Sequence, residues 1–242
     1  MLYKAQYMIL TNVLTIIIPV YNEKKTIQKI IDKVLKIKNL KKQIIIVDDG
    51  STDGTTEVLK TIPKQKIYKI IYSKKNKGKG YAIRLAQPHV QGEFVIIQDA
   101  DLEYNPNDIK KIIKVFKNKN NMVVYGSRVL NTNRYKKNNF ISIIRVFANH
   151  MLTIVSNIIN NQNLTDAHTC YKAFNSKIFK KIKLKENSFS FCPEITTKIS
   201  KLNIPITEIK ISYKGRSVKD GKKISLKDAF IAIKTLIKYR FC

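Results

Sequence analysis

Long apolar runs and cysteine pairs are both missing from this chain of 242 residues. No stretch of about 18 uncharged apolar residues occurs, so the sequence predicts no transmembrane helix. Residues 1–12 lack the layout of a signal peptide, and we expect them to be a lead-in to the first strand. The three cysteines, Cys170, Cys192 and Cys242, show no metal-binding spacing, and an odd count without a signal peptide fits a reducing cytosol.

Acidic residues are few. Asp and Glu together number 17 against 46 for Lys and Arg, which gives a formal net charge of +29. Such an excess favours a polyanionic partner, either nucleic acid or an anionic membrane surface. A compositional bias explains it equally well, because lysine, isoleucine and asparagine are used along the whole chain and the charge is not gathered in one tail.

Apolar runs alternate with amphipathic stretches through the first two thirds of the chain, a pattern typical of buried parallel strands joined by crossover helices. The length suits one domain with a full core, and we treat residues 1–242 as a single α/β domain with a mostly parallel central sheet flanked by helices. We expect strands near residues 13–19, 43–48, 68–73, 93–98 and 121–126, and helices near 24–38, 53–61, 78–87, 107–117, 140–160 and 226–239.

The strand predicted at 93–98 ends in two aspartates, Asp99 and Asp101. In extended backbone, residues two apart point to the same side, so these carboxylates could share one hard divalent cation. Mg²⁺ and Mn²⁺ favour oxygen ligands, and Glu103 is the next carboxylate on that side. Taken alone, an acidic turn after a buried strand fits this segment as well.

Polar clusters follow three earlier strands too, and ligands bind beyond the carboxyl ends of strands in open α/β sheets. In chain order the segments read IIIPVYNE (16–23), VDDGSTDGT (47–55), NKGKGYAIR (76–84) and DADLEYNP (99–106). These four ordered motifs resemble family 2 of the glycosyltransferases, which have a GT-A fold. The second half of the chain resembles the dolichyl-phosphate mannose synthase-like, or polyprenyl-phosphate glycosyltransferase, subfamily.

The resemblance implies a donor pocket for a nucleotide diphosphate sugar of the GDP-mannose or UDP-glucose type. Without the other motifs, helix and turn capping would explain the residues after the first two strands. The Gly78-Lys79-Gly80 segment brings backbone close to a neighbour, with a cation beside it. The residues assigned to the donor and its metal-bound diphosphate are Pro19, Tyr21, Glu23, Asp48, Asp49, Lys79, Asp99, Ala100, Asp101, Arg216 and Lys222.

On the acceptor side, the resemblance implies that Arg128 and Arg145 hold a lipid phosphate, and an Arg can do so through two parallel N–H donors. For Arg145 the alternative is a side chain that reaches solvent from an amphipathic helix. Asp166 lies in an acidic loop before a Cys-Tyr-Lys strand, where His168 replaces an expected acidic residue. The catalytic residues implied are Asp99, Asp101, Arg128 and Asp166, and the metal ligands are Asp99, Asp101 and Glu103.

The expected activity is inverting transfer of a hexose to a polyprenyl phosphate with Mg²⁺ or Mn²⁺. A hydroxyl acceptor would instead need a carboxylate base, for which Asp166 or Glu194 are candidates, although Glu194 could equally start a helix. A nucleic-acid-binding protein would exploit the charge, but the sequence has no aromatic RNA-binding module, and we expect no specific nucleic acid partner.

The expected location is peripheral, on the cytoplasmic face of a membrane. Relatives of this type often carry C-terminal membrane helices, which this chain lacks, so a membrane-anchoring partner subunit is a further expectation. The closing helix, at the start of residues 226–242, places Phe230, Ile233 and Leu236 among lysines, which favours docking on an anionic membrane surface.

Overall fold

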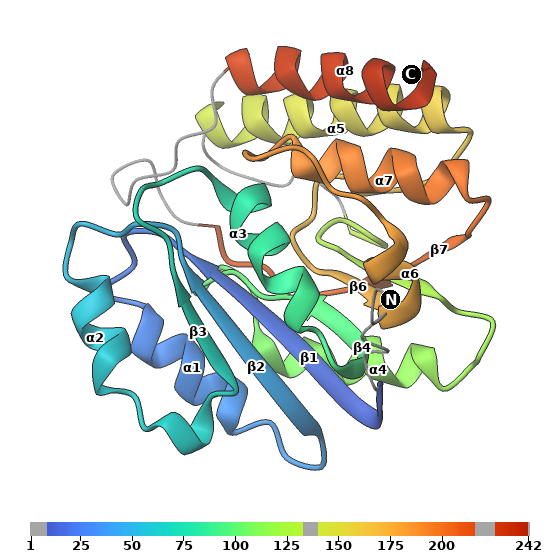
Figure 1. Cartoon of the computed structure of the whole chain (residues 1–242). Helices are drawn as coiled ribbons and strands as arrows, with labels where there is room; N and C mark the ends of the chain where they lie inside the picture. Colours follow the sequence, from blue (N-terminus) through green and yellow to red (C-terminus); the bar gives the residue numbers. More distant parts are fainter. Residues whose placement is uncertain (1–8, 133–139, 216–225, 242) are drawn as a thin grey trace, which may run out of the picture.

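The computed structural model describes residues 9–132, 140–215 and 226–241, with the side chains of 140–145 and 226–227 left out. Seven strands form one sheet in the order β3-β2-β1-β4-β6-β5-β7 (Figure 1). The strands are β1 Leu10–Val20, β2 Lys41–Asp48, β3 Lys69–Tyr72, β4 Gly92–Ile97, β5 Val123–Ser127, β6 Lys172–Asn175 and β7 Ile206–Lys210.

The sheet is mostly parallel, as the sequence predicts. Neighbouring strands pair in parallel except at β6, which is antiparallel to both β4 and β5. The carboxyl ends of β1, β2 and β4 therefore meet at one edge, where the polar motifs lie. The first strand begins earlier than expected: Leu10 donates its N–H to the carbonyl of Gln91 at 2.7 Å, so residues 10–12 belong to β1 and not to a lead-in.

The helices confirm each segment predicted from the apolar pattern. Their bounds are α1 Ile27–Leu35, α2 Thr55–Thr61, α3 Lys79–Ala86, α4 Ile109–Phe116, α5 Phe140–Asn160, α6 Ser176–Lys181, α7 Phe191–Lys201 and α8 Leu226–Phe241. The sequence pattern gives no bounds for β6, β7, α6 or α7. In α7 the periodic signal is weak because Pro193, Glu194 and Thr197 are all buried.

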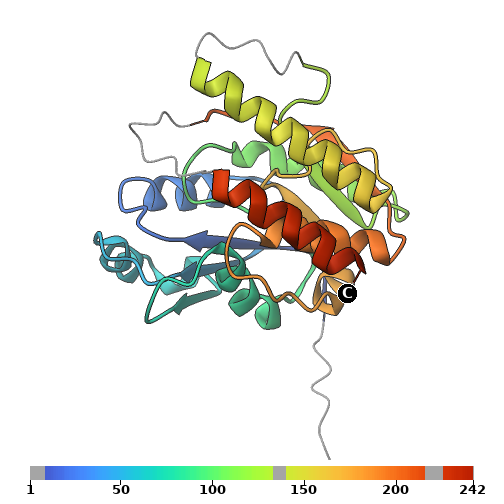
Figure 2. The ribbon, with the colours of Figure 1, turned by 90° about the horizontal axis from the view of Figure 1, so that it is seen from above.

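Both faces of the sheet are covered, which is why its strands read as continuous apolar runs. In β1, Ile16 and Ile18 pack in one core cluster with α1 and α4, whereas Ile17 packs in the other with α3, α6 and α7. Helices α5 and α8 lie side by side over α7 and form an outer layer (Figures 1 and 2). Within the described ranges, we find no helix with the length and apolar character needed to cross a bilayer.

Candidate active site

Side chains of the second motif tie the end of β2 to the start of α3. Asp48 is buried and accepts a hydrogen bond from the Ser51 N–H at 3.0 Å. Asp49 accepts from the backbone N–H groups of Gly78 at 2.6 Å and Lys77 at 3.0 Å. Burial raises the pKa of Asp49 above its usual value, although these N–H groups oppose the shift. Asp49 thus fixes the start of α3 against the end of β2.

Three residues of the first motif shape the same edge. Pro19 is buried in β1 opposite Val47, and the Tyr21 side chain is exposed. The Glu23 carboxylate accepts from the Thr26 hydroxyl at 2.6 Å at the start of α1. Glu23 and Asp49 thus bond the chain just before α1 and α3, while Tyr21 presents its ring to solvent.

Lys79 and Asp99 meet at the centre of this edge. The Lys79 ammonium forms an ion pair with the Asp99 carboxylate and lies 2.9 Å from the Cys170 sulfur. Burial alone would lower the pKa of Lys79, but the Asp99 charge outweighs it, and the pKa lies above its usual value. The sequence names both residues for the donor site, and the structure brings them into direct contact. Ala100 is buried beside them.

The Glu103 carboxylate has a partner of its own, the hydroxyl of Tyr213. Leu102 has a left-handed backbone (φ +63°), which breaks the extended alternation assumed from sequence. The Glu103 N–H donates to Asp101 at 3.0 Å, while the Glu103 carboxylate accepts from the Tyr213 hydroxyl at 2.6 Å. In the described part of the chain, no three His, Cys, Asp or Glu side chains form a group that could hold a metal. The predicted three-carboxylate cluster is therefore not assembled.

Arg128 and Asp166 form a two-pronged ion pair beyond β5. The Arg128 Nε and Nη2 each donate to a different Asp166 oxygen at 2.7 Å, and the Arg128 N–H adds a third bond at 3.0 Å. Glu208 accepts the N–H of Asp166 at 3.0 Å. Burial opposes ionisation of Asp166, but the Arg128 charge prevails and keeps the pKa of Asp166 below its usual value.

An aromatic cluster, which the sequence analysis did not single out, supports these charged groups. Tyr104 stacks on Tyr171 with ring centres 4.8 Å apart, and Tyr213 tilts against Tyr104 at 5.2 Å. The Tyr104 hydroxyl accepts the N–H of Cys170 at 3.0 Å, and Arg128 lies 5.2 Å from the Tyr213 ring centre. The sequence offers one clue to this cluster, since Tyr104 lies within the acidic motif, directly after Glu103.

Two further candidates have structural partners. Glu194 is fully buried, and its carboxylate accepts from the N–H groups of Lys185 at 2.6 Å and Glu186 at 2.9 Å and from Lys198 at 2.5 Å. These contacts engage the carboxylate, and Glu194 lies in the first turn of α7, the position that the alternative to a base describes. Burial, with the nearby Lys172 charge, lowers the pKa of His168 to about 4, so the imidazole is neutral at pH 7. The side chains of Arg145, Arg216 and Lys222 lie outside the described residues.

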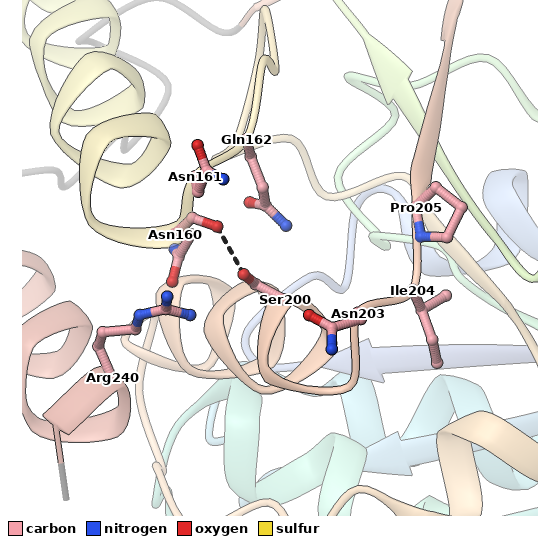
Figure 3. A pocket seen from close by; sticks show the side chains of 8 residues that line it. All are labelled: Asn160, Asn161, Gln162, Ser200, Asn203, Ile204, Pro205 and Arg240. Atoms are coloured by element: carbon pink, nitrogen blue, oxygen red, sulfur yellow. Dashed lines mark hydrogen bonds between the residues drawn. The ribbon is translucent and has the colours of Figure 1, made fainter.

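A separate polar pocket of about 290 Å³ lies between the ends of α5, α7 and α8 (Figure 3). Ser200 donates its hydroxyl to the Asn160 carbonyl at 2.6 Å, and Arg240 reaches the pocket from α8. Ile204 and Pro205, at its rim, precede β7, so the pocket opens at the amino end of that strand. The pocket thus lies at the opposite end of the strands from Asp99, which follows the carboxyl end of β4.

Comparison with known proteins gives a consistent result. Residues 15–183 match Glycosyl transferase family 2. The chain is 30% identical to a dolichyl-phosphate beta-glucosyltransferase of Trichomonas vaginalis, over 93% of this chain and 72% of that protein. It is 29% identical to the UDP-N-acetylglucosamine–dolichyl-phosphate N-acetylglucosaminyltransferase of Methanococcus voltae, over 87% of this chain and 90% of that protein.

Among solved structures, glucosyl-3-phosphoglycerate synthase of Mycobacterium tuberculosis, crystallised with Mn²⁺, uridine diphosphate and phosphoglyceric acid, has a similar fold. The TM-score is 0.70 at 14% identity, over 95% of this chain and 79% of that one. The sheet order and this similarity show a GT-A fold, as the sequence predicts. The chain belongs to glycosyl transferase family 2.

Proposed function

We propose that this enzyme transfers a hexose from a nucleotide diphosphate sugar to a polyprenyl phosphate. The observation that carries the donor half is the largely buried Lys79–Asp99 ion pair, in which a cation already contacts the carboxylate that follows β4. When a donor diphosphate and its metal ion bind, each residue of the pair can exchange its partner. Lys79 would then contact a phosphate oxygen, and Asp99 would contact the divalent cation. The acceptor half is supported by the names of the relatives in Trichomonas and Methanococcus.

Asp99 and Asp101 would hold Mg²⁺ or Mn²⁺. Their chemistry fits, because both are carboxylates and these ions prefer oxygen ligands, with phosphate oxygens completing the set. When bound, the ion would neutralise charge on the leaving diphosphate. Lys79, released from Asp99, would then contribute a second positive charge to the same phosphates. Arg216 and Lys222 remain donor contacts proposed from the sequence.

The carboxylates around the site agree better with a phosphate acceptor than with a hydroxyl acceptor. A phosphate oxygen is already anionic at neutral pH, so transfer to it needs no general base. A hydroxyl acceptor needs one, and both candidates are committed elsewhere: Asp166 to Arg128 and Glu194 to Lys198 and two backbone N–H groups. A carboxylate whose pKa is held low by an Arg is a weak base. Arg128, with Arg145 proposed from sequence, would bind the acceptor phosphate.

The outer helices would hold the enzyme at an anionic membrane surface. Four large apolar side chains are exposed on each of these helices: Phe147, Met151, Ile154 and Ile158 on α5, and Phe230, Ile231, Ile237 and Phe241 on α8. Single exposed apolar residues are ordinary, but several of them on each of two adjacent helices are typical of an interaction face. With a net charge of +29, the partner that we propose is an anionic bilayer, on its cytoplasmic face.

The donor is tested by supplying the enzyme with Mn²⁺, polyprenyl phosphate and one radiolabelled nucleotide sugar at a time. UDP-glucose, UDP-N-acetylglucosamine and GDP-mannose form the panel. We expect one of them to yield label that extracts into organic solvent and is released by mild acid, as a sugar bound to prenyl phosphate would be. No extractable label from any donor, with a folded enzyme, would contradict the proposal.

A further inference from the structure

The two glycines around Lys79 are required by a neighbouring stretch of the chain, residues 185–190, here called the bridge segment. A Cβ at Gly78 would lie 2.6 Å from the carbonyl oxygen of Asn187, and one at Gly80 would overlap the carbonyl oxygen of Glu186. The N–H of Tyr81 donates to the Asn187 carbonyl at 3.0 Å. The bridge segment therefore packs directly on the first turn of α3, where Lys79 begins the helix.

The same segment is bonded to helix α8 through one side chain. The Glu186 Oε1 accepts hydrogen bonds from the Lys238 ammonium at 2.9 Å and the Tyr239 hydroxyl at 2.8 Å. Its Oε2 accepts from the Ser190 hydroxyl at 3.1 Å. Burial opposes ionisation of Glu186, but these three donors prevail, and its pKa lies below the usual value. Glu186 thus presents its carbonyl to α3 and its carboxylate to α8.

The bridge segment is also held at its beginning. The buried carboxylate of Glu194 in α7 accepts the N–H groups of Lys185 and Glu186, and Arg84 of α3 donates to the side-chain oxygen of Asn187 at 2.6 Å. A segment that charge-assisted bonds join to α3, α7 and α8 transmits a displacement between these helices more readily than a loose loop does. A shift of α8 along its axis would therefore move the surface on which Lys79 rests.

We propose that Glu186 is a positioning residue, through which α8 sets the placement of Lys79 at the donor diphosphate. The proposal rests on the proposed function, because it takes Lys79 to bind the donor. It gives α8 a second role beside bilayer contact: seating of the helix favours the arrangement of α3 that binds nucleotide. Glu186 itself touches no substrate.

The test is nucleotide affinity, measured by calorimetry with UDP, GDP and Mn²⁺ and no acceptor or vesicle. Glu186→Gln keeps the shape but removes the charge, and we expect it to weaken nucleotide binding about fivefold, at the low end of couplings between sites. Lys238→Met combined with Tyr239→Phe removes the donors from α8 and should act in the same direction. Glu57→Gln, the same change on the exposed side of α2, is the matched control and should leave affinity unchanged.

The thermal midpoint and the KM values distinguish a positioning role of Glu186 from a role in stability alone. The proposal expects KM for the donor to rise while KM for the prenyl phosphate stays constant, with Tm within a few degrees of the parent. Unchanged nucleotide affinity in the α8 double variant would overturn it, and that variant decides if Glu186→Gln does not fold. If the parent enzyme binds neither nucleotide, the proposed function fails instead.

Discussion

Lys79 and Asp99 come from different motifs, one at the start of α3 and the other just after β4, and form a largely buried ion pair between them. The pair places a positive charge on the carboxylate that we propose as a metal ligand. Metal and lysine therefore compete for Asp99, whereas metal and diphosphate together satisfy both residues. Binding of the two should be strongly cooperative for this reason.

Replacing Lys79 tests that competition. In Lys79→Met, we expect Mn²⁺ alone to bind more tightly, because the ammonium no longer occupies Asp99. Affinity for nucleotide diphosphate with Mn²⁺ should fall about tenfold, since a charge-assisted phosphate contact is lost. Calorimetry measures both quantities, and Lys74→Met, an exposed lysine before α3, is the control. Weaker Mn²⁺ binding in Lys79→Met would contradict this account.

Asp101 and Glu103, two carboxylates after β4, should differ sharply in their effect on kcat. Asp101→Asn is expected to lower kcat by about a thousandfold, because a metal ligand at the leaving group would be lost. Glu103→Gln should stay within about tenfold of the parent, because Glu103 is bonded to Tyr213 and not grouped for metal. Initial rates with and without EDTA measure this. Equal losses in the two variants would show that Glu103 is a ligand after all.

Stability should fall in mild acid because of His168. Its folded pKa of about 4, lowered by burial and by Lys172, lies below the value near 6.5 of the unfolded chain. Between these values the unfolded state binds more protons, so stability is full above pH 6.5 and is lost as pH falls toward 4, by about 1–3 kcal/mol. Urea unfolding of the parent and of His168→Asn at pH 7 and 5 measures the difference. An equal pH dependence in both proteins would refute the role of His168.

The outer helices should bind anionic vesicles in a salt-dependent way. Phe230 is 75% exposed, so Phe230→Ser is expected to cost little stability but to reduce co-sedimentation with phosphatidylserine vesicles several-fold. Leu202→Ser removes an exposed apolar residue outside α5 and α8 and serves as the control. Equal binding to neutral and anionic vesicles at low salt would count against the electrostatic part of the proposal.

The architecture could be predicted from local patterns, because apolar runs and helical periodicity report burial directly. Contacts between segments that are distant in the sequence could not be predicted in this way. The sequence indicates that Gly78 and Gly80 approach some neighbour, but only the fold identifies it as the bridge segment. The left-handed backbone of Leu102, which changes where the Glu103 side chain lies, carries no signal in a leucine. The Lys79–Asp99 and Arg128–Asp166 pairs join residues far apart in the chain, which spacing alone does not reveal.

The acceptor is the central claim, and one measurement tests it most directly. The enzyme is given its labelled donor and Mn²⁺ with either a polyprenyl phosphate or the prenyl alcohol of the same length in the same vesicles, and a soluble saccharide is tested in parallel. We predict that label appears in the lipid extract only with the phosphate, because Asp166 and Glu194 are not available as bases. Glycosylation of the alcohol or the saccharide at a similar rate would contradict the account.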